Sequence, residues 1–271
     1  CGACTVGCPF GAIGYKSEIV PVIKSLKEKD DVIALVAPSI SGQFGRSVSL
    51  GQVITGLKEL GFSEIREVAV AADEVAKLEA EEEIDGWLTN SCCPAYKNYV
   101  TKHFPELKDH VSHQLSPMAL MATQIRKEKP NSYLVFIGPC LSKKEEAQEL
   151  VDAVLTFEEI ACMFVARDIN LATLGKSPYT DSPSKYGLGF AQSGGVSAAL
   201  GTYKSVKVKT LNGLSECKKA LLLAKANRID AEFLEGMACS GGCVGGPGTL
   251  VDANFSRRVL QSEISEREKE E

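Results

Sequence analysis

Ten cysteines, beside only three histidines, are the side chains in this sequence best suited to metal or redox chemistry. A chain of 271 residues buries enough apolar surface to fold without disulfide staples. No charged-then-apolar secretory leader follows Cys1, so we expect a cytoplasmic location, where thiols stay reduced. Clustered reduced cysteines bind metal more often than they form disulfides, so metal binding is the leading interpretation.

Five of the cysteines follow three segments that the sequence predicts to be strands. The segments and their cysteines are 86–90 with Cys92 and Cys93, 132–137 with Cys140, and 231–237 with Cys239 and Cys243. Open α/β sheets assemble their sites at the carboxyl ends of strands, so three such loops can converge. Four thiolates are the usual ligand set of a 4Fe–4S cluster, which leaves one cysteine over.

The loop around Cys239 and Cys243 has six glycines within residues 235–248. Glycine lets the backbone approach a bulky inorganic group and turn its N–H groups toward sulfide or small anions. A zinc knuckle fits this loop poorly, because the Cys-x3-Cys spacing has no second knuckle to pair with. Cys162 and Cys217 lie on predicted apolar helices, where we expect buried structural thiols.

The first residues form a separate cysteine motif. Cys1, Cys4 and Cys8-Pro9 reproduce the last three cysteines of the bacterial ferredoxin run Cys-x2-Cys-x2-Cys-x3-Cys-Pro. In that run the fourth cysteine serves a different cluster from its neighbours. We therefore expect a truncated ferredoxin-like segment over residues 1–30, with incomplete accessory 4Fe–4S sites and a linker.

Alternating strands and helices must position these loops. The predicted strands are 31–38, 65–71, 86–90, 132–137 and 231–237, and the predicted helices are 47–60, 73–83, 117–129, 156–165, 195–203 and 216–227. This alternation favours an α/β fold with mainly parallel sheets flanked by helices. We expect a main domain over 31–250, with lobes at about 31–172 and 185–250 and a hinge at 173–184. Residues 251–271 are predicted to be a charged, solvated helix or tail.

Composition excludes several classes of function. The chain has 30 Lys and Arg against 35 Asp and Glu, so no basic surplus is available for nucleic acid. Apolar residues make up 44%, but no run approaches the roughly 20 that a membrane helix needs. We expect neither a nucleic-acid partner nor a membrane span.

Three signatures, in this order over about residues 31–248, resemble the catalytic domain of iron-only (FeFe) hydrogenases. They are Thr89-Asn-Ser-Cys92-Cys93-Pro94, Pro139-Cys140-Leu-Ser-Lys143-Lys-Glu-Glu146 and Glu235-Gly-Met-Ala-Cys239-Ser-Gly-Gly-Cys243-Val-Gly-Gly. The resemblance implies an H-cluster between the lobes, in which a 4Fe–4S cube is joined through cysteine sulfur to a two-iron unit. That unit carries CO, cyanide and a bridging dithiolate.

The resemblance also implies roles for residues in these motifs. The ligands of the cube would be Cys93, Cys140, Cys239 and Cys243, with Cys243 bridging to the two-iron unit. The remaining thiol, Cys92, would pass protons to and from the dithiolate amine. Lys143 would present its ammonium to one cyanide, and the turn at Pro38 and Ser39 would hydrogen-bond the other.

Proton delivery by resemblance would continue through Glu79, Glu82 and Ser112. A solvated helix face is the alternative for most of the acidic cluster 79–83, and no arginine stands where the relay of the family reaches the surface. The three histidines, His103, His110 and His113, are interpreted as surface polar residues.

Departures from the motif of the family surround the expected two-iron unit. Gly138 replaces a methionine, and Met118 replaces a glutamine; Met237 belongs to the third motif. Such changes alter the groups that tune the potential of a cluster and its ligand binding. They resemble the sensory, slowly turning-over branch of the family.

The sequence thus predicts a hydrogenase that interconverts 2H⁺ + 2e⁻ and H2, slow and used for hydrogen sensing. The alternative is a non-catalytic relative that acts in iron–sulfur cluster assembly. Expected partners are H2 and protons, a ferredoxin-like electron carrier or upstream cluster domain, and the maturation proteins that build the two-iron unit.

Overall fold

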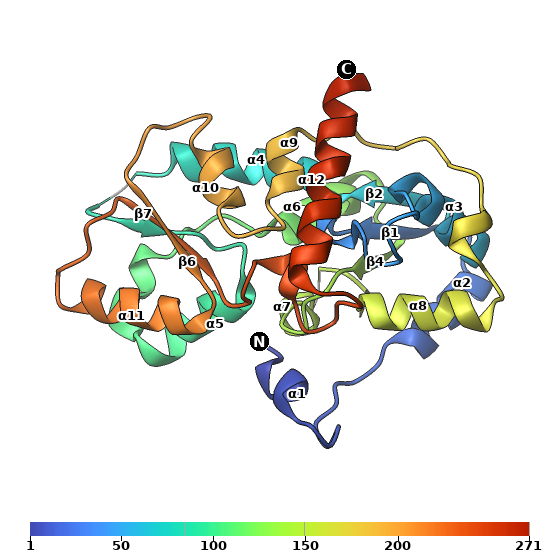
Figure 1. Ribbon diagram of the computed structural model, residues 1–271, viewed down its shortest axis with the longest axis horizontal. Coiled ribbons are helices and arrows are strands. Elements are labelled where there is room, and N and C mark those ends of the chain that lie inside the picture. Colours follow the sequence, from blue (N-terminus) through green and yellow to red (C-terminus); the bar gives the residue numbers. More distant parts are fainter. Residues whose placement is uncertain (84, 149, 271) are drawn as a thin grey trace.

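In the described part of the chain, seven strands form two parallel sheets, each flanked by helices (Figure 1). The computed structural model describes residues 1–83, 85–148 and 150–270. The strands are β1 (Val32–Val36), β2 (Glu64–Glu67), β3 (Leu88–Thr89), β4 (Tyr133–Ile137), β5 (Ala153–Leu155), β6 (Val208–Asn212) and β7 (Phe233–Met237). The first sheet has the order β2-β1-β4-β5 and the second the order β3-β7-β6. The predicted α/β class with parallel sheets is confirmed.

The helices cover both sheets and fill the connections between strands. The α-helices are α1 (Ala3–Gly7), α2 (Ile19–Glu28), α3 (Leu50–Leu60), α4 (Val68–Glu81), α5 (Pro94–His103), α6 (Pro117–Glu128), α7 (Lys143–Glu146), α8 (Phe157–Ala166), α9 (Lys185–Gly189), α10 (Gly195–Leu200), α11 (Leu214–Lys225) and α12 (Ala253–Glu270). Short 3-10 helices are η1 (Pro38–Ile40), η2 (Pro105–His110), η3 (Leu171–Thr173) and η4 (Cys243–Gly245). None of the described helices is both long enough and apolar enough to cross a bilayer.

The first sheet surrounds the larger apolar core. Every residue of β1 is buried, as expected for a central parallel strand covered on both faces. The helix α3 packs against this sheet and begins at a capping box formed by Ser49 and Gln52. It ends at Gly61, whose φ of 109° is the left-handed conformation that glycine adopts at least cost.

The second sheet departs from the expected lobe boundaries. Its strand β3 precedes residue 172, yet it pairs with β7, which lies after residue 185. The chain therefore enters the second sheet, returns to the first through α6 and β4, and enters the second again. A division at 173–184 cannot capture this crossing, because it assigns strands by their order along the chain.

Two predicted elements have different bounds. The predicted strand 65–71 ends at Glu67, and α4 begins at Val68 rather than at Asp73. Asp73 lies inside α4, and its carboxylate accepts a hydrogen bond from the Ser184 amide at 2.8 Å. It thus ties the start of α9 to α4 instead of capping its own helix.

The last helix and the expected hinge both pack against the protein. α12 contacts α9, η1 and η4, and Leu260 and Ser256 on it are fully buried. The prediction of a charged helix is confirmed, and most of its described charged residues are exposed, but one face is buried against the protein rather than solvated; Glu271 lies outside the described residues. In the expected hinge, Ser177 donates its amide to the Gly51 carbonyl, and Asp181 pairs with Arg66.

Candidate metal centre

The three cysteine loops leave the carboxyl ends of strands from both sheets. Cys92 and Cys93 follow β3, and Cys93 precedes α5, whose first residue is Pro94. Cys140 follows β4 of the first sheet, while Cys239 and Cys243 follow β7 of the second. The three loops thus leave parallel strands of both sheets and carry the five thiols.

A cavity of about 590 Å³, including the part open to solvent, lies between these loops. Its cysteines are Cys92, Cys93, Cys140 and Cys243. The wall is otherwise mostly apolar, with side chains from both sheets and from η1, α4 and α6. Its other residues are Ala37, Pro38, Ser39, Val68, Ala72, Pro117, Met118, Phe136, Pro139, Lys143, Phe190, Ala191 and Met237.

The thiols lie close enough to act on one another electrostatically. Burial, together with the charge of Cys93, raises the pKa of Cys140 to about 11. Burial, together with the charges of Cys140 and Cys93, raises the pKa of Cys239 to about 12. Burial, then Cys93, Cys140 and Cys239, raise the pKa of Cys243. All four predicted ligands are therefore neighbours, although Cys239 is not among the cavity-lining residues.

The thiols do not form a single-ion site among the described residues. Among the described residues, no three His, Cys, Asp or Glu side chains gather closely enough to hold a single metal ion. In a 4Fe–4S cube each cysteine binds a different iron atom, so its ligands need not surround one point.

The glycines of the third loop are required by close packing. Gly242 has a φ of 89°, and a Cβ there would lie 2.7 Å from the Ser193 amide nitrogen. The neighbouring Gly241 also has a positive φ, of 88°. A side chain at residue 242 would push the loop off the segment before α10, and one at residue 241 would crowd Ala253 of α12.

Two polar side chains reach the otherwise apolar cavity. Lys143 is buried; its Nζ donates to Ser116 Oγ at 2.8 Å and pairs with Glu146, which leaves a third ammonium hydrogen for the cavity. Ser39 is fully buried, and its Oγ has no hydrogen-bond partner among the described residues. Buried polar groups are normally paired, so an orphaned hydroxyl facing a cavity indicates a missing acceptor or donor.

The three predicted relay residues lie together beside Cys92. Glu79 is buried, its Oε1 accepts from the Ser91 amide at 3.2 Å, and burial raises its pKa to about 7. The Ser112 hydroxyl opposes this shift in pKa and donates to Glu82 Oε2 at 2.7 Å. The charge of Glu79 in turn contributes to the raised pKa of Cys92. Glu79 is therefore not on a solvated helix face.

Phe136 fills the space beside Gly138. A Cβ at residue 138 would lie 2.6 Å from Phe136 Cε1 and 3.2 Å from Ala37 Cβ. Phe136 itself lines the cavity, together with Met118 and Met237, which are both buried. The aromatic ring thus supplies the volume that a side chain at residue 138 would otherwise occupy.

Comparison with known proteins agrees with this geometry. Residues 30–247 match the family described as iron only hydrogenase large subunit, C-terminal domain. The chain belongs to this family. Membership implies an iron–sulfur H-cluster, and the residues fit one: neighbouring thiols from three loops, an orphaned Ser39 hydroxyl and a buried ammonium surround one cavity.

Individual relatives include enzymes and an assembly factor. Iron hydrogenase 1 of Clostridium pasteurianum is 28% identical over 89% of this chain, which spans 54% of the length of that relative. The cytosolic Fe–S cluster assembly factor NAR1 of Kluyveromyces lactis is 30% identical over 46% of this chain and 23% of its own length. The structure of [FeFe]-hydrogenase HydA1 from Chlamydomonas reinhardtii matches with a TM-score of 0.75 at 21% identity, covering 90% of this chain and 88% of that one.

The N-terminal cysteine segment lies against two of the cysteine loops. Gly2 packs on Leu141, which follows Cys140, and on Pro247, which follows Cys243. Cys1 and Cys4 are exposed, and backbone N–H groups of residues 10–13 lower the pKa of Cys8. Backbone donors around a thiolate are a common feature of iron–sulfur sites.

The two remaining cysteines differ from each other. Cys217 is fully buried, and its Sγ donates to the Met237 carbonyl at 3.6 Å, as the structural interpretation predicts. Cys162 is exposed on α8, so the prediction that it is buried is wrong. The apolar side chains near it in sequence face the core on the opposite side of the helix.

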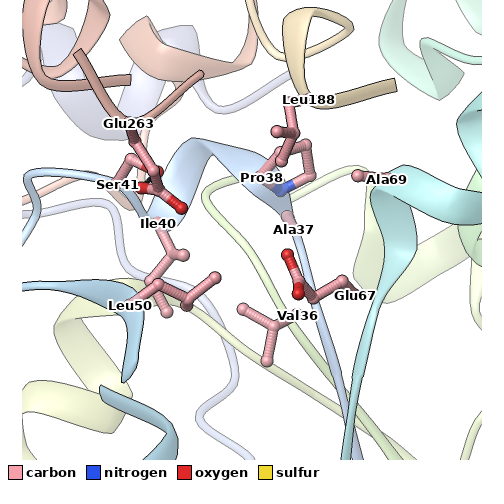
Figure 2. Close-up of a pocket in the computed structure, with 10 residues that line it drawn as sticks. All are labelled: Val36, Ala37, Pro38, Ile40, Ser41, Leu50, Glu67, Ala69, Leu188 and Glu263. Carbon is pink, nitrogen blue, oxygen red and sulfur yellow. Dashed lines mark hydrogen bonds between the residues drawn. The ribbon is translucent and has the colours of Figure 1, made fainter. Parts of the chain in front are cut away.

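Sequence reasoning missed a buried ion network beside the site. A small second cavity shares Ala37 and Pro38 with the first, and Figure 2 shows Glu67 and Glu263 entering it from different elements. Arg267 of α12 donates to Glu67 Oε2 and Glu263 Oε1, both at 2.9 Å. These residues are up to 200 positions apart, so no local pattern links them.

Proposed function

We propose that this chain is the catalytic domain of an FeFe hydrogenase that interconverts 2H⁺ + 2e⁻ and H2, slowly, in hydrogen sensing. The observation that carries the proposal is the joint lining of one cavity by Cys92, Cys93, Cys140, Cys243, Ser39 and Lys143. A bare cube needs only thiolates. The additional thiol, hydroxyl and ammonium are the groups that a second, anion-bearing metal unit would require.

The H-cluster, when bound, supplies electrons and the metal atoms at which protons and H2 interconvert. Cys93, Cys140, Cys239 and Cys243 would hold it, with Cys243 shared between the cube and the two-iron unit. The apolar cavity wall excludes bulk water, which strengthens the interaction of every polar group inside it with the cluster ligands.

Lys143 and Ser39 orient the two-iron unit. The Lys143 ammonium is already held by Ser116 and Glu146, so little further ordering is needed when it donates to a cyanide. Ser39, placed by the turn that begins at Pro38, offers its unpaired hydroxyl to the other cyanide.

Protons reach the cavity through Cys92, Glu79, Ser112 and Glu82. Glu79 has a pKa of about 7, so near neutral pH it can both hold and release a proton. Ser112 can accept a proton from Glu79 on its hydroxyl oxygen while it donates its own to Glu82. Asn90 Nδ2 donates to Cys92 Sγ at 3.1 Å and fixes the thiol at the inner end of this route.

Slow turnover is proposed from the residues around the two-iron unit. Gly138 offers no thioether, Met118 offers no amide, and the Phe136 ring closes the space beside Gly138. Met237 completes this apolar wall. If the matured protein turned over as fast as the most active family members, this part of the proposal would be wrong.

Electrons would enter from the N-terminal side. Cys1, Cys4 and Cys8 would contribute to accessory 4Fe–4S clusters, and Gly2 of their segment packs on Leu141 and Pro247, beside Cys140 and Cys243 in the sequence. A ferredoxin-like carrier or an upstream cluster domain would supply this end. Maturation proteins would deliver the two-iron unit, in the cytoplasm.

The test is infrared spectroscopy of the protein after reconstitution with iron and sulfide and loading with a synthetic two-iron precursor. Protein-bound CO and cyanide bands that shift under H2 are the expected result. A Cys92→Ser variant should keep the bands but lose turnover, because its ligands remain while its thiol is gone. The absence of bands in a protein whose cube is visible by electron paramagnetic resonance would overturn the proposal.

That second outcome defines the alternative function. A protein with a cube and no two-iron unit would fit a role in cluster assembly. The similarity to NAR1, which covers 46% of this chain, supports this alternative. In that case Lys143→Met should leave the spectrum of the cube unchanged, because no cyanide is present to lose a donor.

A further inference from the structure

An exposed histidine connects Glu82 to the solvent. His113 Nδ1 lies 2.9 Å from Glu82 Oε1, and the His113 backbone amide donates to the same oxygen at 2.8 Å. The His113 side chain is 80% exposed, whereas that of Glu82 is only 13% exposed. The imidazole therefore covers a carboxylate that is otherwise shielded from water.

The two neighbours in sequence, Ser112 and His113, contact opposite oxygens of this carboxylate. Ser112 is buried and binds Oε2, on the side of Glu79, while His113 is exposed and binds Oε1. Glu82 thus has one hydrogen-bonded contact toward the protein interior and one toward the surface. No other titratable side chain among the described residues is hydrogen-bonded to this carboxylate.

We propose that His113 exchanges protons between the solvent and Glu82, as the outer end of the proton route of this domain. The inference rests on the proposed function. Imidazole suits the task because it gains and loses a proton near neutral pH, and its two nitrogens can face two different partners.

The transfer balances without another reactant. A water or buffer acid gives a proton to Nε2, the ring gives the Nδ1 proton to Glu82 Oε1, and the ring is left neutral. Glu82 then passes a proton from its carboxyl group to Ser112, and the exposed ring resets by giving its Nε2 proton to one water while Nδ1 takes a proton from another. In the reverse direction each proton retraces these bonds to solvent.

Other charged groups near Glu82 do not offer this path. The Lys204 ammonium donates to the Glu82 backbone carbonyl at 3.2 Å, not to its carboxylate. Glu79 and Glu235 lie on the interior side, where both are buried. Within the described ranges of the chain, His113 is thus the titratable side chain that is both exposed and hydrogen-bonded to the Glu82 carboxylate.

The first test needs no cofactor. Nitrogen NMR of the ring should show neutral His113 with its proton on Nδ1, because Glu82 accepts there, and Glu82→Ala should move that proton to Nε2. A proton on Nε2 in both proteins would overturn the proposal whether or not the domain binds an H-cluster. This result also separates failure of the inference from failure of the proposed function.

The second test uses the matured protein and chemical rescue. His113→Ala should lower the rate of H2 production about tenfold, and added imidazole should restore it. His113→Gln keeps a hydrogen-bond donor, so it should be as stable to heat as the unmodified protein. Its rate of H2 production should nevertheless be as low as that of His113→Ala. An unchanged rate, or a slow variant that imidazole does not restore, would contradict the proposal.

His103→Ala is the matched control. His103 is also an exposed histidine, at the end of α5, and it packs on the Tyr99 ring rather than on a carboxylate. Its replacement should leave the rate unchanged, with or without imidazole. A rate that imidazole raises equally in the His103 and His113 variants would overturn the assignment, because the effect would then be unspecific.

Discussion

At the scale of single residues, the Phe136 ring and Gly138 form a matched pair beside the cavity. Because a Cβ at residue 138 would lie 2.6 Å from the ring, Gly138→Met should destabilise the protein by about 1–3 kcal/mol. Phe136→Ala alone should also destabilise it, by leaving a cavity. Together the two changes should cost less than the sum of the single ones, as measured by denaturant unfolding.

Gly175→Met is the control for the Gly138 prediction. No neighbouring atom lies within 4 Å of a Cβ at residue 175, so a side chain fits there without displacement. If Gly138→Met were as harmless as Gly175→Met, the ring would not be filling the space in question. If the costs of Gly138→Met and Phe136→Ala simply added in the double variant, the pairing of the ring with Gly138 would be contradicted as well.

The burial of Glu79 predicts a pH dependence of stability. Its pKa is raised from the ordinary value of 4.5 to about 7, so between these values the folded protein binds a proton that the unfolded chain releases. The free energy of unfolding from this group should therefore fall as pH rises from about 4.5 to 7, then level off.

Glu79→Gln should remove that fall. The free energy of unfolding of the variant, minus that of the unmodified protein, should rise by on the order of 1–3 kcal/mol from pH 5 to pH 8. Denaturant unfolding at each pH measures this difference. Glu81→Gln, on the exposed face of the same helix, is the control and should track the unmodified protein. A parallel pH profile for Glu79→Gln would mean that the Glu79 carboxyl is solvated.

At the scale of elements, the sequence predicts best where local patterns decide the structure. The strands β1 and β4 are correctly predicted because buried parallel strands form continuous apolar runs between turn residues. The strand β7 is also correctly predicted, although its buried residues include Glu235. The two-residue strand β3 is overextended to 86–90 in the prediction, and β5 and β6 are missed. The extent of β3, β5 and β6 is set by pairing with neighbouring strands more than by the local sequence of each strand.

The site is predictable for a related reason. Cysteines after strands converge because parallel strands share an edge, so the ligands follow from the order of elements. What could not be predicted is packing between distant residues: the burial of Glu79, the contact of His113 with Glu82, and the pairing of Arg267 with Glu67. Judged by residue type alone, all of these side chains would be predicted to lie in solvent.

The element that most departs from its expected role is α12. Arg267 joins it to Glu67 on β2, and Ser41 Oγ beside η1 donates to Glu263 at 2.6 Å. Because these charges are largely buried, Arg267→Ala should cost about 3–5 kcal/mol and speed amide hydrogen exchange along α12. Arg258→Ala, exposed on the same helix, should leave both measurements unchanged. Equal effects at the two positions would mean that α12 is held by its apolar contacts alone.

At the scale of the whole molecule, the expected cluster joins loops from two different sheets. Cys140 comes from the first sheet, whereas Cys93, Cys239 and Cys243 come from the second. The apolar cores of the two sheets are also distinct sets of side chains. A group bound by all four thiols would therefore oppose separation of the sheets, in addition to the chemistry it supplies.

Anaerobic reconstitution with iron and sulfide should accordingly raise the unfolding temperature by on the order of 5–10 °C, because a ligand bound to the folded state stabilises it. Cys140→Ser removes the first sheet's one predicted ligand and should abolish most of this gain. Cys162→Ser, at an exposed thiol on α8, should keep the full gain. If Cys140→Ser gained as much as Cys162→Ser, the cluster would be held by the second sheet alone and would not join the two halves of the molecule.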